Sequence, residues 1–185
     1  MNIYYLNNLN VINSVSKDFF ESIQTPWLTK CMLFITDIGG PGSIALYCLV
    51  LVMFMWLHKK YNHIVQFILT MSVSAFVAVV LKETLKIQRP SGGLISEVGY
   101  SFVSAHTLIA TVFLVLLVYS YKDHFKIKLV RTFFVVASTL FVILIGVSRV
   151  YLGVHYMTDV LGGLFVGLIL SAFSILLYSK GHKRS

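Results

Sequence analysis

Ionisable side chains are rare in this sequence, and those that could do chemistry fall into three groups. In chain order they are Lys82 with Arg89 and Pro90, then Ser104 with His106, then Ser148, Arg149, His155 and Asp159. Only 12% of the residues are charged, whereas 57% are apolar. Each group stands at the end of a long apolar run, where an ionisable residue is costly and therefore indicates function. Cations, histidines, a serine and a carboxylate are what a site needs to hold a phosphate and attack it.

The first group is spaced for a single helical face. Lys82, Lys86 and Arg89 stand at positions i, i+4 and i+7, so a helix reaching Arg89 would present them on one side. Pro90 disfavours helix at Arg89 and indicates that a loop begins there. Two cations aimed at one point suit a tetrahedral dianion, with the arginine fork as the bidentate partner. The alternative is that a basic side chain only extends along apolar surface to place its charge at the membrane interface, and we assign this role to Lys86.

The second group begins another apolar run. Ser104 can cap the helix that follows, and the first N–H groups of that helix would point at a bound anion. His106 could donate a proton to a leaving alkoxide if its pKa lies near neutral. The alternative for His106 is a hydrogen-bonded polar side chain at the membrane interface.

The third group places His155 and Asp159 one helical turn apart. A carboxylate at that spacing can hold the imidazole Nδ1–H, fix the tautomer and leave Nε2 free as a nucleophile. The same orienting arrangement operates in hydrolase triads. Arg149 stands just before this pair and could grip the phosphate under attack. The alternative is a His–Asp pair that caps a helix and has no catalytic role.

The three groups resemble the signature motifs of the type 2 phosphatidic acid phosphatase family. These motifs are K-x6-R-P, P-S-G-H and S-R-x5-H-x3-D, and this chain matches the first and third at every defined position. The second departs twice, with Val103 and Ala105 where the family usually has Pro and Gly. Ser104 and His106 remain, so the departure concerns the shape of the loop more than its chemistry. The resemblance covers roughly Leu81–Leu170.

This resemblance implies an integral membrane phosphatase that hydrolyses a lipid phosphate or diphosphate through a phosphohistidine. Undecaprenyl diphosphate and phosphatidylglycerophosphate are substrates of similar bacterial enzymes. By the same resemblance His155 is the nucleophile, Asp159 orients it and His106 is the general acid. The residues expected to bind the phosphate are Lys82, Arg89, Ser104 and Arg149. No cofactor and no metal are implied, because the cations supply the charge and the sequence has no carboxylate cluster to hold magnesium.

Other functions remain open on these residues. A lipid phosphotransferase would use the same phosphohistidine, with another lipid in place of water as the acceptor. A non-enzymatic channel or transporter would need polar residues at mid-membrane depth or paired broken helices, and the apolar middles of the runs argue against it. A vanadate-dependent oxidase resembles these motifs too, but such enzymes are usually soluble.

Five uncharged runs indicate the elements that position these residues. Each is close to the length of about 20 residues that a spanning helix needs, and none alternates like a barrel strand. The runs are Gly42–Leu57, Ile64–Leu81, Ala105–Tyr121, Thr132–Ser148 and Val160–Ser179. The sequence therefore predicts an all-α, polytopic membrane helix bundle with about five transmembrane helices.

The N-terminal part has a different pattern. Apolar residues recur at helical spacing across Asn10–Gln24, opposite a polar side, which is typical of a helix lying in the membrane interface. A second short interfacial helix is predicted at Trp27–Asp37, with Thr25-Pro26 as its start signal. The glycines and proline of residues 39–42 should separate it from the first span. We predict one domain, with N-terminal interfacial amphipathic helices at 1–41 and the membrane-embedded bundle at 42–185.

The charge distribution predicts how the chain crosses the membrane. The net charge is +8, but the basic residues stand in short connectors, which indicates membrane topology and argues against nucleic-acid binding. Those expected in the cytoplasm are Lys59, Lys60, Lys122, Lys126, Lys128, Arg131, Lys180, Lys183 and Arg184. The Lys82–His106 and Arg149–His155 connectors then face outward together.

We therefore expect an integral protein of the bacterial-type cell (inner) membrane, with its active site facing the periplasm or exterior. The expected partners are the lipid bilayer and a membrane lipid phosphate as substrate. The sequence leaves the oligomeric state open.

Overall fold

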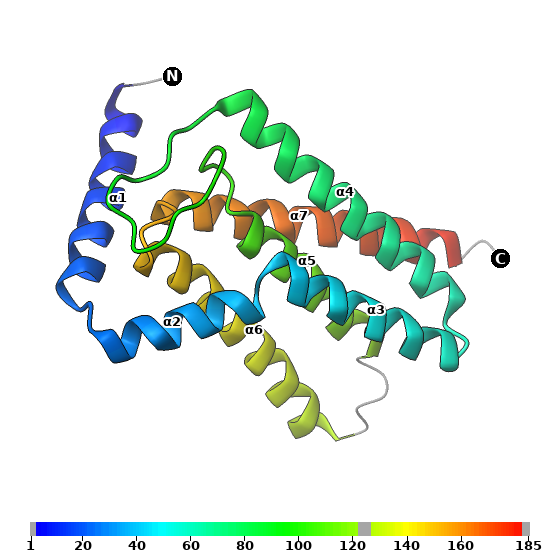
Figure 1. Ribbon diagram of the computed structural model, residues 1–185. Coiled ribbons are helices and arrows are strands. Elements are labelled where there is room, and N and C mark those ends of the chain that lie inside the picture. Colours follow the sequence, from blue (N-terminus) through cyan, green and yellow to red (C-terminus); the bar gives the residue numbers. More distant parts are fainter. Residues whose placement is uncertain (1–2, 122–126, 183–185) are drawn as a thin grey trace.

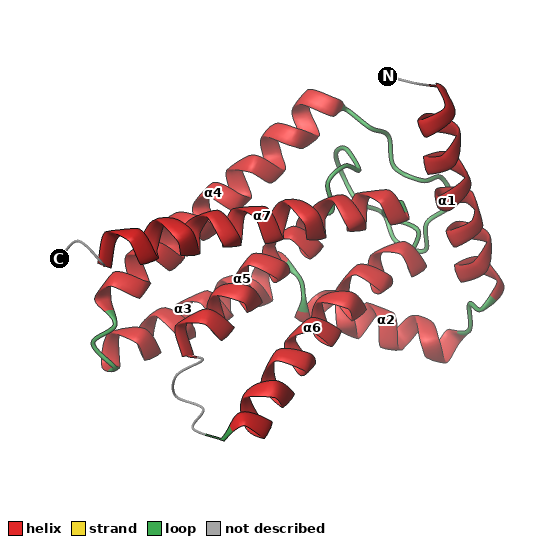
Figure 2. Cartoon of the chain, turned by 180° about the vertical axis from the view of Figure 1, so that it is seen from behind, coloured by secondary structure: helices red, strands yellow, loops and turns green. Residues whose placement is uncertain are grey.

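All regular elements in the described part of the chain are α-helices. The computed structural model describes residues 3–121 and 127–182. Its helices are α1 (Ile3–Ser22), α2 (Pro26–Ile38), α3 (Pro41–Leu57), α4 (Tyr61–Leu85), α5 (Ala105–Tyr121), α6 (Lys128–Tyr151) and α7 (Met157–His182). Figures 1 and 2 show α3, α4, α5 and α7 running side by side, with α1 and α2 near the end of the bundle where α7 begins. The predicted all-α class is confirmed.

The predicted spans correspond to α3–α7. Within residues 3–121 and 127–182, α4, α6 and α7 are each long and apolar enough to cross a bilayer, and α2 with α3 makes a fourth candidate, bent by 44°. The remaining helix, α5, is also apolar and has 17 residues. The bend falls between Ile38 and Pro41, where the sequence predicted a break. Gly39 allows close packing there, because a Cβ at this position would lie 2.7 Å from the Ile145 side chain.

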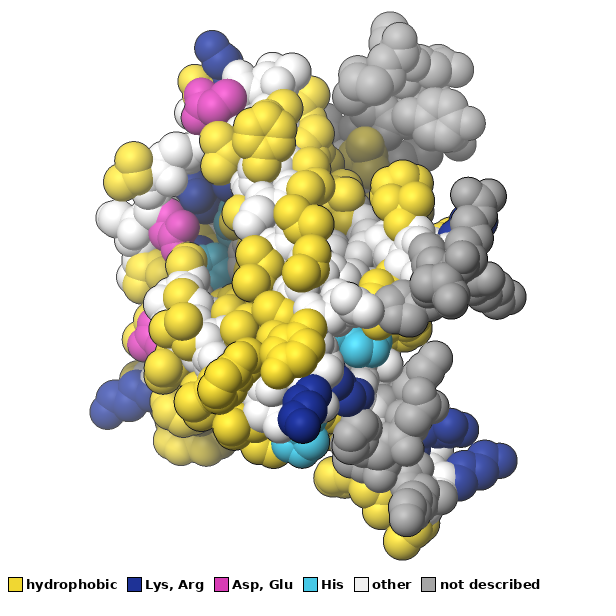
Figure 3. Space-filling view, turned by 90° about the vertical axis from the view of Figure 1, so that its right-hand side faces the viewer, with side chains coloured by type: hydrophobic (Ala, Val, Ile, Leu, Met, Phe, Trp, Pro, Cys, Tyr) yellow, Lys and Arg dark blue, Asp and Glu magenta, His cyan; other side chains and the backbone are white. Residues whose placement is uncertain are grey.

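The outer surface of the bundle is largely apolar. Figure 3 shows hydrophobic side chains over most of one face, with charged side chains gathered towards its edges. Exposed large apolar residues include Leu49 on α3, Phe76 on α4, Phe133 on α6 and Phe165 on α7. A helical bundle that exposes such side chains all round needs an apolar solvent, so the chain is an integral membrane protein.

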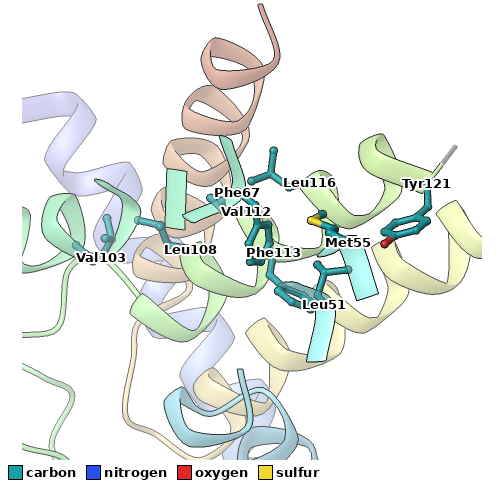
Figure 4. Packing of buried hydrophobic residues seen from close by; sticks show 10 residues of the cluster. Leu51, Met55, Phe67, Val103, Leu108, Val112, Phe113, Leu116 and Tyr121 are labelled. Atoms are coloured by element: carbon teal, nitrogen blue, oxygen red, sulfur yellow. The ribbon is translucent and has the colours of Figure 1, made fainter. Parts of the chain in front are cut away.

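Helix α5 lies at the centre of the bundle, in contact with α3, α4, α6 and α7. Figure 4 shows its buried side chains Leu108, Val112 and Leu116 among apolar residues of neighbouring helices, such as Phe67 of α4 and Met55 of α3. The central position of α5 fixes its first turn, which carries His106, relative to every other spanning helix.

Small residues bring α7 into close contact with α5. A Cβ added at Gly163 would lie 2.7 Å from the Ser104 backbone oxygen, and one added at Gly167 would lie 2.9 Å from Thr111 Cβ. This is the small-xxx-small pattern by which membrane helices approach closely. As a result the first turn of α7, with Asp159, lies against the start of α5.

The end of α4 differs from the sequence prediction. Helix α4 stops at Leu85, and Lys86 takes a left-handed conformation with φ of 50°, its N–H bonded to the Lys82 oxygen at 3.0 Å. Such a cap closes the last turn, and Pro90 keeps Arg89 out of helix. Arg89 therefore lies in the following loop, and the prediction of one helical face for Lys82, Lys86 and Arg89 is wrong.

The loop of residues 86–104 lies against the connector of residues 152–156, as the topology predicted. The Leu94 N–H donates to the Leu152 oxygen at 2.9 Å. Nearby, a Cβ on Gly93 would lie 2.7 Å from the Gly153 oxygen, and Gly153 has φ of +69°. Glycine is needed at both positions for the two backbones to meet. The two connectors that carry the motif residues thus form one surface.

Helix α1 packs beside this surface, where the Lys17 ammonium donates to the Ser91 oxygen at 3.3 Å.

The α3–α4 connector with Lys59 and Lys60 lies at the other end of the bundle (Figure 1). Lys122, Lys126, Lys183 and Arg184 lie outside the described residues. The division at residues 41 and 42 stays a prediction, since α1 and α2 both contact α6.

Candidate active site

His155 and Asp159 form a buried pair at the start of α7. The His155 Nδ1 lies 3.4 Å from Asp159 Oδ2. The same carboxylate oxygen accepts hydrogen bonds from the Ser101 hydroxyl at 2.5 Å and from the Tyr156 N–H at 2.8 Å. Because several donors hold Asp159 in place, it can fix the orientation of the imidazole.

Contacts on both sides of the His155 ring define its tautomer. Arg89 Nη1 lies 3.3 Å from Nε2. A guanidinium can only donate, so Nε2 must be the acceptor and Nδ1 carries the hydrogen that faces Asp159. The lone pair of Nε2 therefore points to the guanidinium of Arg89.

The guanidinium of Arg89 is held by the loop in which it lies. Its Nε donates to the Gly99 oxygen at 3.0 Å, and its Nη2 donates to the Val98 oxygen at 3.2 Å. Its Nη1 donates to the Val154 oxygen at 2.8 Å, next to His155. These bonds connect the two connectors and fix the cation beside the imidazole.

Arg149, in the last turn of α6, is the largest fully buried side chain among the residues whose burial is described, with 1% of its surface exposed. Its Nη1 donates to the Thr36 hydroxyl at 2.6 Å, and its Nη2 is paired with Glu97 Oε1. Its Nε is buried without a hydrogen-bond partner in the part of the chain that the structure describes. A buried donor without a partner is unfavourable unless a ligand satisfies it.

The other predicted residues lie close to this centre, in different environments. Lys82 Nζ donates to the backbone oxygens of Tyr100 and Ser101 at 2.6 and 3.2 Å, so it supports the loop. Ser104 is buried before α5, and its N–H donates to the Asp159 backbone oxygen at 3.1 Å. His106 is partly buried in the first turn of α5, and its side chain has no hydrogen bond to another described residue.

Three residues that contact the predicted site residues were not identified from the sequence. Glu97 bridges Arg89 and Arg149, with its Oε2 3.4 Å from Arg89 Nη2. Ser101 holds Asp159, and Thr36 on α2 holds Arg149. Glu97 had one signal in the sequence, because it is one of only seven acidic residues and stands in the same connector as the cations. Ser101 and Thr36 had none.

Two pKa shifts describe the electrostatics of the site. Burial lowers the pKa of the His155 imidazole, and this outweighs the opposing influence of the Asp159 carboxylate. The neutral form of the ring is thereby favoured. Burial alone would raise the pKa of Glu97, but the hydrogen bond from Arg149 and the surrounding positive charges bring it below its ordinary value. Glu97 is therefore ionised at neutral pH.

Comparisons with known proteins show the family of this chain. Residues 63–183 match the model of the PAP2 superfamily. The chain is 32% identical over 151 residues to phosphatidylglycerophosphatase B of Bacillus subtilis (strain 168), an alignment that covers 80% of this chain and 74% of the relative.

Solved structures have the same fold. The transmembrane PAP2-type phosphatidylglycerolphosphate phosphatase of Bacillus subtilis superposes with a TM-score of 0.83 at 26% identity, covering 96% of this chain and 94% of that one. Aquifex aeolicus LpxE superposes with a TM-score of 0.64 at 24% identity, covering 92% and 93%, and shares the fold. On the family match and the sequence identity, this chain belongs to the PAP2 superfamily, the type 2 phosphatidic acid phosphatases.

Proposed function

We propose that this protein hydrolyses a phosphate monoester or diphosphate of a membrane lipid through a phosphohistidine on His155. The observation that carries the proposal is the contact between His155 Nε2 and Arg89 at 3.3 Å, beside Arg149 and its unpartnered Nε. A phosphate bound by both guanidinium groups would meet the Nε2 lone pair. The name of the Bacillus subtilis relative makes phosphatidylglycerophosphate the first substrate to test.

The proposed reaction has two steps. Nε2 of His155 attacks phosphorus while the bond to the lipid oxygen breaks, and His106 gives its proton to the departing alkoxide. Water then attacks the phosphohistidine, His106 takes a proton from that water, and inorganic phosphate leaves. Asp159 stabilises the charged imidazole between the steps. Arg89, Arg149 and the Ser104 hydroxyl bind the phosphate oxygens, and Lys82 adds positive charge while it holds the loop.

The substrate class and the need for metal can be tested together. Purified protein should release phosphate from phosphatidylglycerophosphate, phosphatidic acid or undecaprenyl diphosphate, and EDTA should leave the rate unchanged because Arg89 and Arg149 provide the charge that a metal supplies elsewhere. Phosphate release is measured in detergent micelles, with heat-inactivated protein as the control. No release from any of the three lipids would refute the proposed function, and strict magnesium dependence would refute the metal-free mechanism.

The role of Arg149 can be separated from its structural role with a conservative change. Arg149→Lys keeps a positive charge opposite Glu97 but loses the fork, so kcat/KM should fall by about 100-fold with little change in melting temperature. Lys86→Ala, at an exposed position outside the cluster, should leave kcat/KM unchanged. Wild-type kcat/KM in Arg149→Lys, together with a loss in Lys86→Ala, would show that positive charge at this surface acts only in general attraction.

We also propose that the site faces the periplasm or exterior of a bacterial-type inner membrane. Support comes from the basic residues of the α3–α4 connector, Lys59 and Lys60, at the opposite end of the bundle. In a background of Cys31→Ser and Cys48→Ser, an impermeant thiol reagent should label Ser96→Cys in intact cells. It should label Lys128→Cys only after lysis. The reverse pattern would place the site in the cytoplasm.

A further inference from the structure

The position between the two arginines of the site is already taken by a carboxylate. Glu97 Oε1 is paired with Arg149 Nη2, and Oε2 lies 3.4 Å from Arg89 Nη2. One carboxylate thus contacts both guanidinium groups that would bind the substrate. A carboxylate and a phosphate present similar oxygen atoms to an arginine fork, so the two compete for the same donors.

A counter-ion at this position has a physical reason. Arg149 is buried, and an unpaired buried charge is strongly unfavourable. Glu97 supplies the opposite charge whenever no phosphate is bound. Its pairing leaves Arg149 Nε without a hydrogen bond in the described part of the chain. The carboxylate therefore balances the charge of Arg149 but does not satisfy all of its N–H donors. A ligand with more oxygen atoms, such as a phosphate, could accept a hydrogen bond from Nε as well.

Displacement of Glu97 requires only a movement of its side chain. The adjacent backbone is fixed, because the Val98 and Gly99 oxygens accept hydrogen bonds from Arg89 at 3.2 and 3.0 Å. The Glu97 side chain is 27% exposed, so a path to solvent exists. Rotation of this side chain would free both guanidinium groups and leave the loop in place.

We propose that Glu97 is an internal competitor of the substrate, which occupies the phosphate position while the site is empty and yields it to a lipid phosphate. This inference rests on the proposed function. A phosphomonoester carries a charge of about −1.5 to −2 at pH 7. Exchange of the single carboxylate charge for this larger charge is favourable, so a monoester can displace Glu97. Every ligand that takes this position must displace the same carboxylate, so Glu97 lowers the affinity of the pocket for each of them by the same factor.

The experiment compares the wild type with Glu97→Gln, using phosphatidic acid as the substrate in detergent micelles at pH 7. Gln keeps the size and removes the charge. Orthovanadate should inhibit Glu97→Gln at about tenfold lower concentration than the wild type, which corresponds to about 1.4 kcal/mol. Phosphatidylglycerol, a phosphodiester lipid, should inhibit Glu97→Gln at a mole fraction about tenfold lower than it inhibits the wild type. Glu83→Gln, at an exposed position of α4, should match the wild type in both assays.

Inhibition constants of Glu97→Gln that equal or exceed those of the wild type would overturn the inference. A wild type that releases no phosphate from any lipid would instead refute the proposed function. If Glu97→Gln does not fold, Glu97→Asp retains a counter-ion for Arg149 with a side chain too short to reach both arginines. Its inhibition constants for vanadate and phosphatidylglycerol should then be lower than those of the wild type, and unchanged values would overturn the inference.

Discussion

His155→Ala is expected to reduce phosphate release by about 10⁵-fold, because the reaction loses the atom that attacks phosphorus. The described part of the chain offers no substitute beside Arg89, since the other nearby histidine, His106, lies in the first turn of α5 and belongs to the leaving-group side of the proposed reaction. Initial rates on the best lipid substrate provide the measurement. A radiolabelled phosphoenzyme should be trapped in the wild type, with an alkaline detergent quench because the phosphorus–nitrogen bond is labile to acid.

The matched control is His58→Ala, which removes a histidine at the end of α3, far from the motif connectors. It should retain wild-type turnover and the phosphoenzyme. Substantial turnover by His155→Ala would contradict the proposed nucleophile, and label retained in that variant would assign the phosphoenzyme to another side chain.

Asp159→Asn should lower kcat by about 10³- to 10⁴-fold while the protein remains folded. An amide of the same shape can still accept the Tyr156 N–H, but it can also donate to Nδ1. The ring would then carry its hydrogen on Nε2, where the lone pair is needed. The lowered pKa of His155 should increase the loss of kcat. The buried ring depends on the carboxylate to stabilise its charged form during the reaction.

Rapid-quench kinetics should locate this loss in the formation of the phosphoenzyme. Asp18→Asn, at an exposed position on α1, should show normal rates. If Asp159→Asn formed the phosphoenzyme at the wild-type rate, the proposed role of the carboxylate in orienting the nucleophile would be refuted.

The sequence predicted the helices well because lipid simplifies the problem. A segment that crosses a bilayer must be apolar and helical, so the uncharged runs indicate α3–α7 directly. It also predicted that the two motif connectors meet, because alternating spans bring them to one side. The bond from Leu94 to Leu152 confirms this.

Prediction failed where loops determine the geometry. Arg89 was expected on a helical face with Lys82, but the left-handed residue Lys86 ends α4 before it. Glu97 and Ser101 reach the site only through the path of an irregular loop, which periodicity does not describe. Thr36 contacts Arg149 because α2 packs on α6, a tertiary contact that no spacing in the sequence indicates.

The packing of α7 against the start of α5 has a consequence for the synthesis and membrane insertion of the protein. Arg89 and the rest of the loop of residues 86–104 are synthesised before α5, whereas His155 and Asp159 follow α6. Asp159 accepts hydrogen bonds from the Ser101 hydroxyl and the Ser104 N–H, and Gly163 and Gly167 admit the neighbouring helix. A nascent chain therefore cannot assemble the proposed catalytic centre until α7 has entered the membrane, and we expect an incompletely translated copy to be inactive.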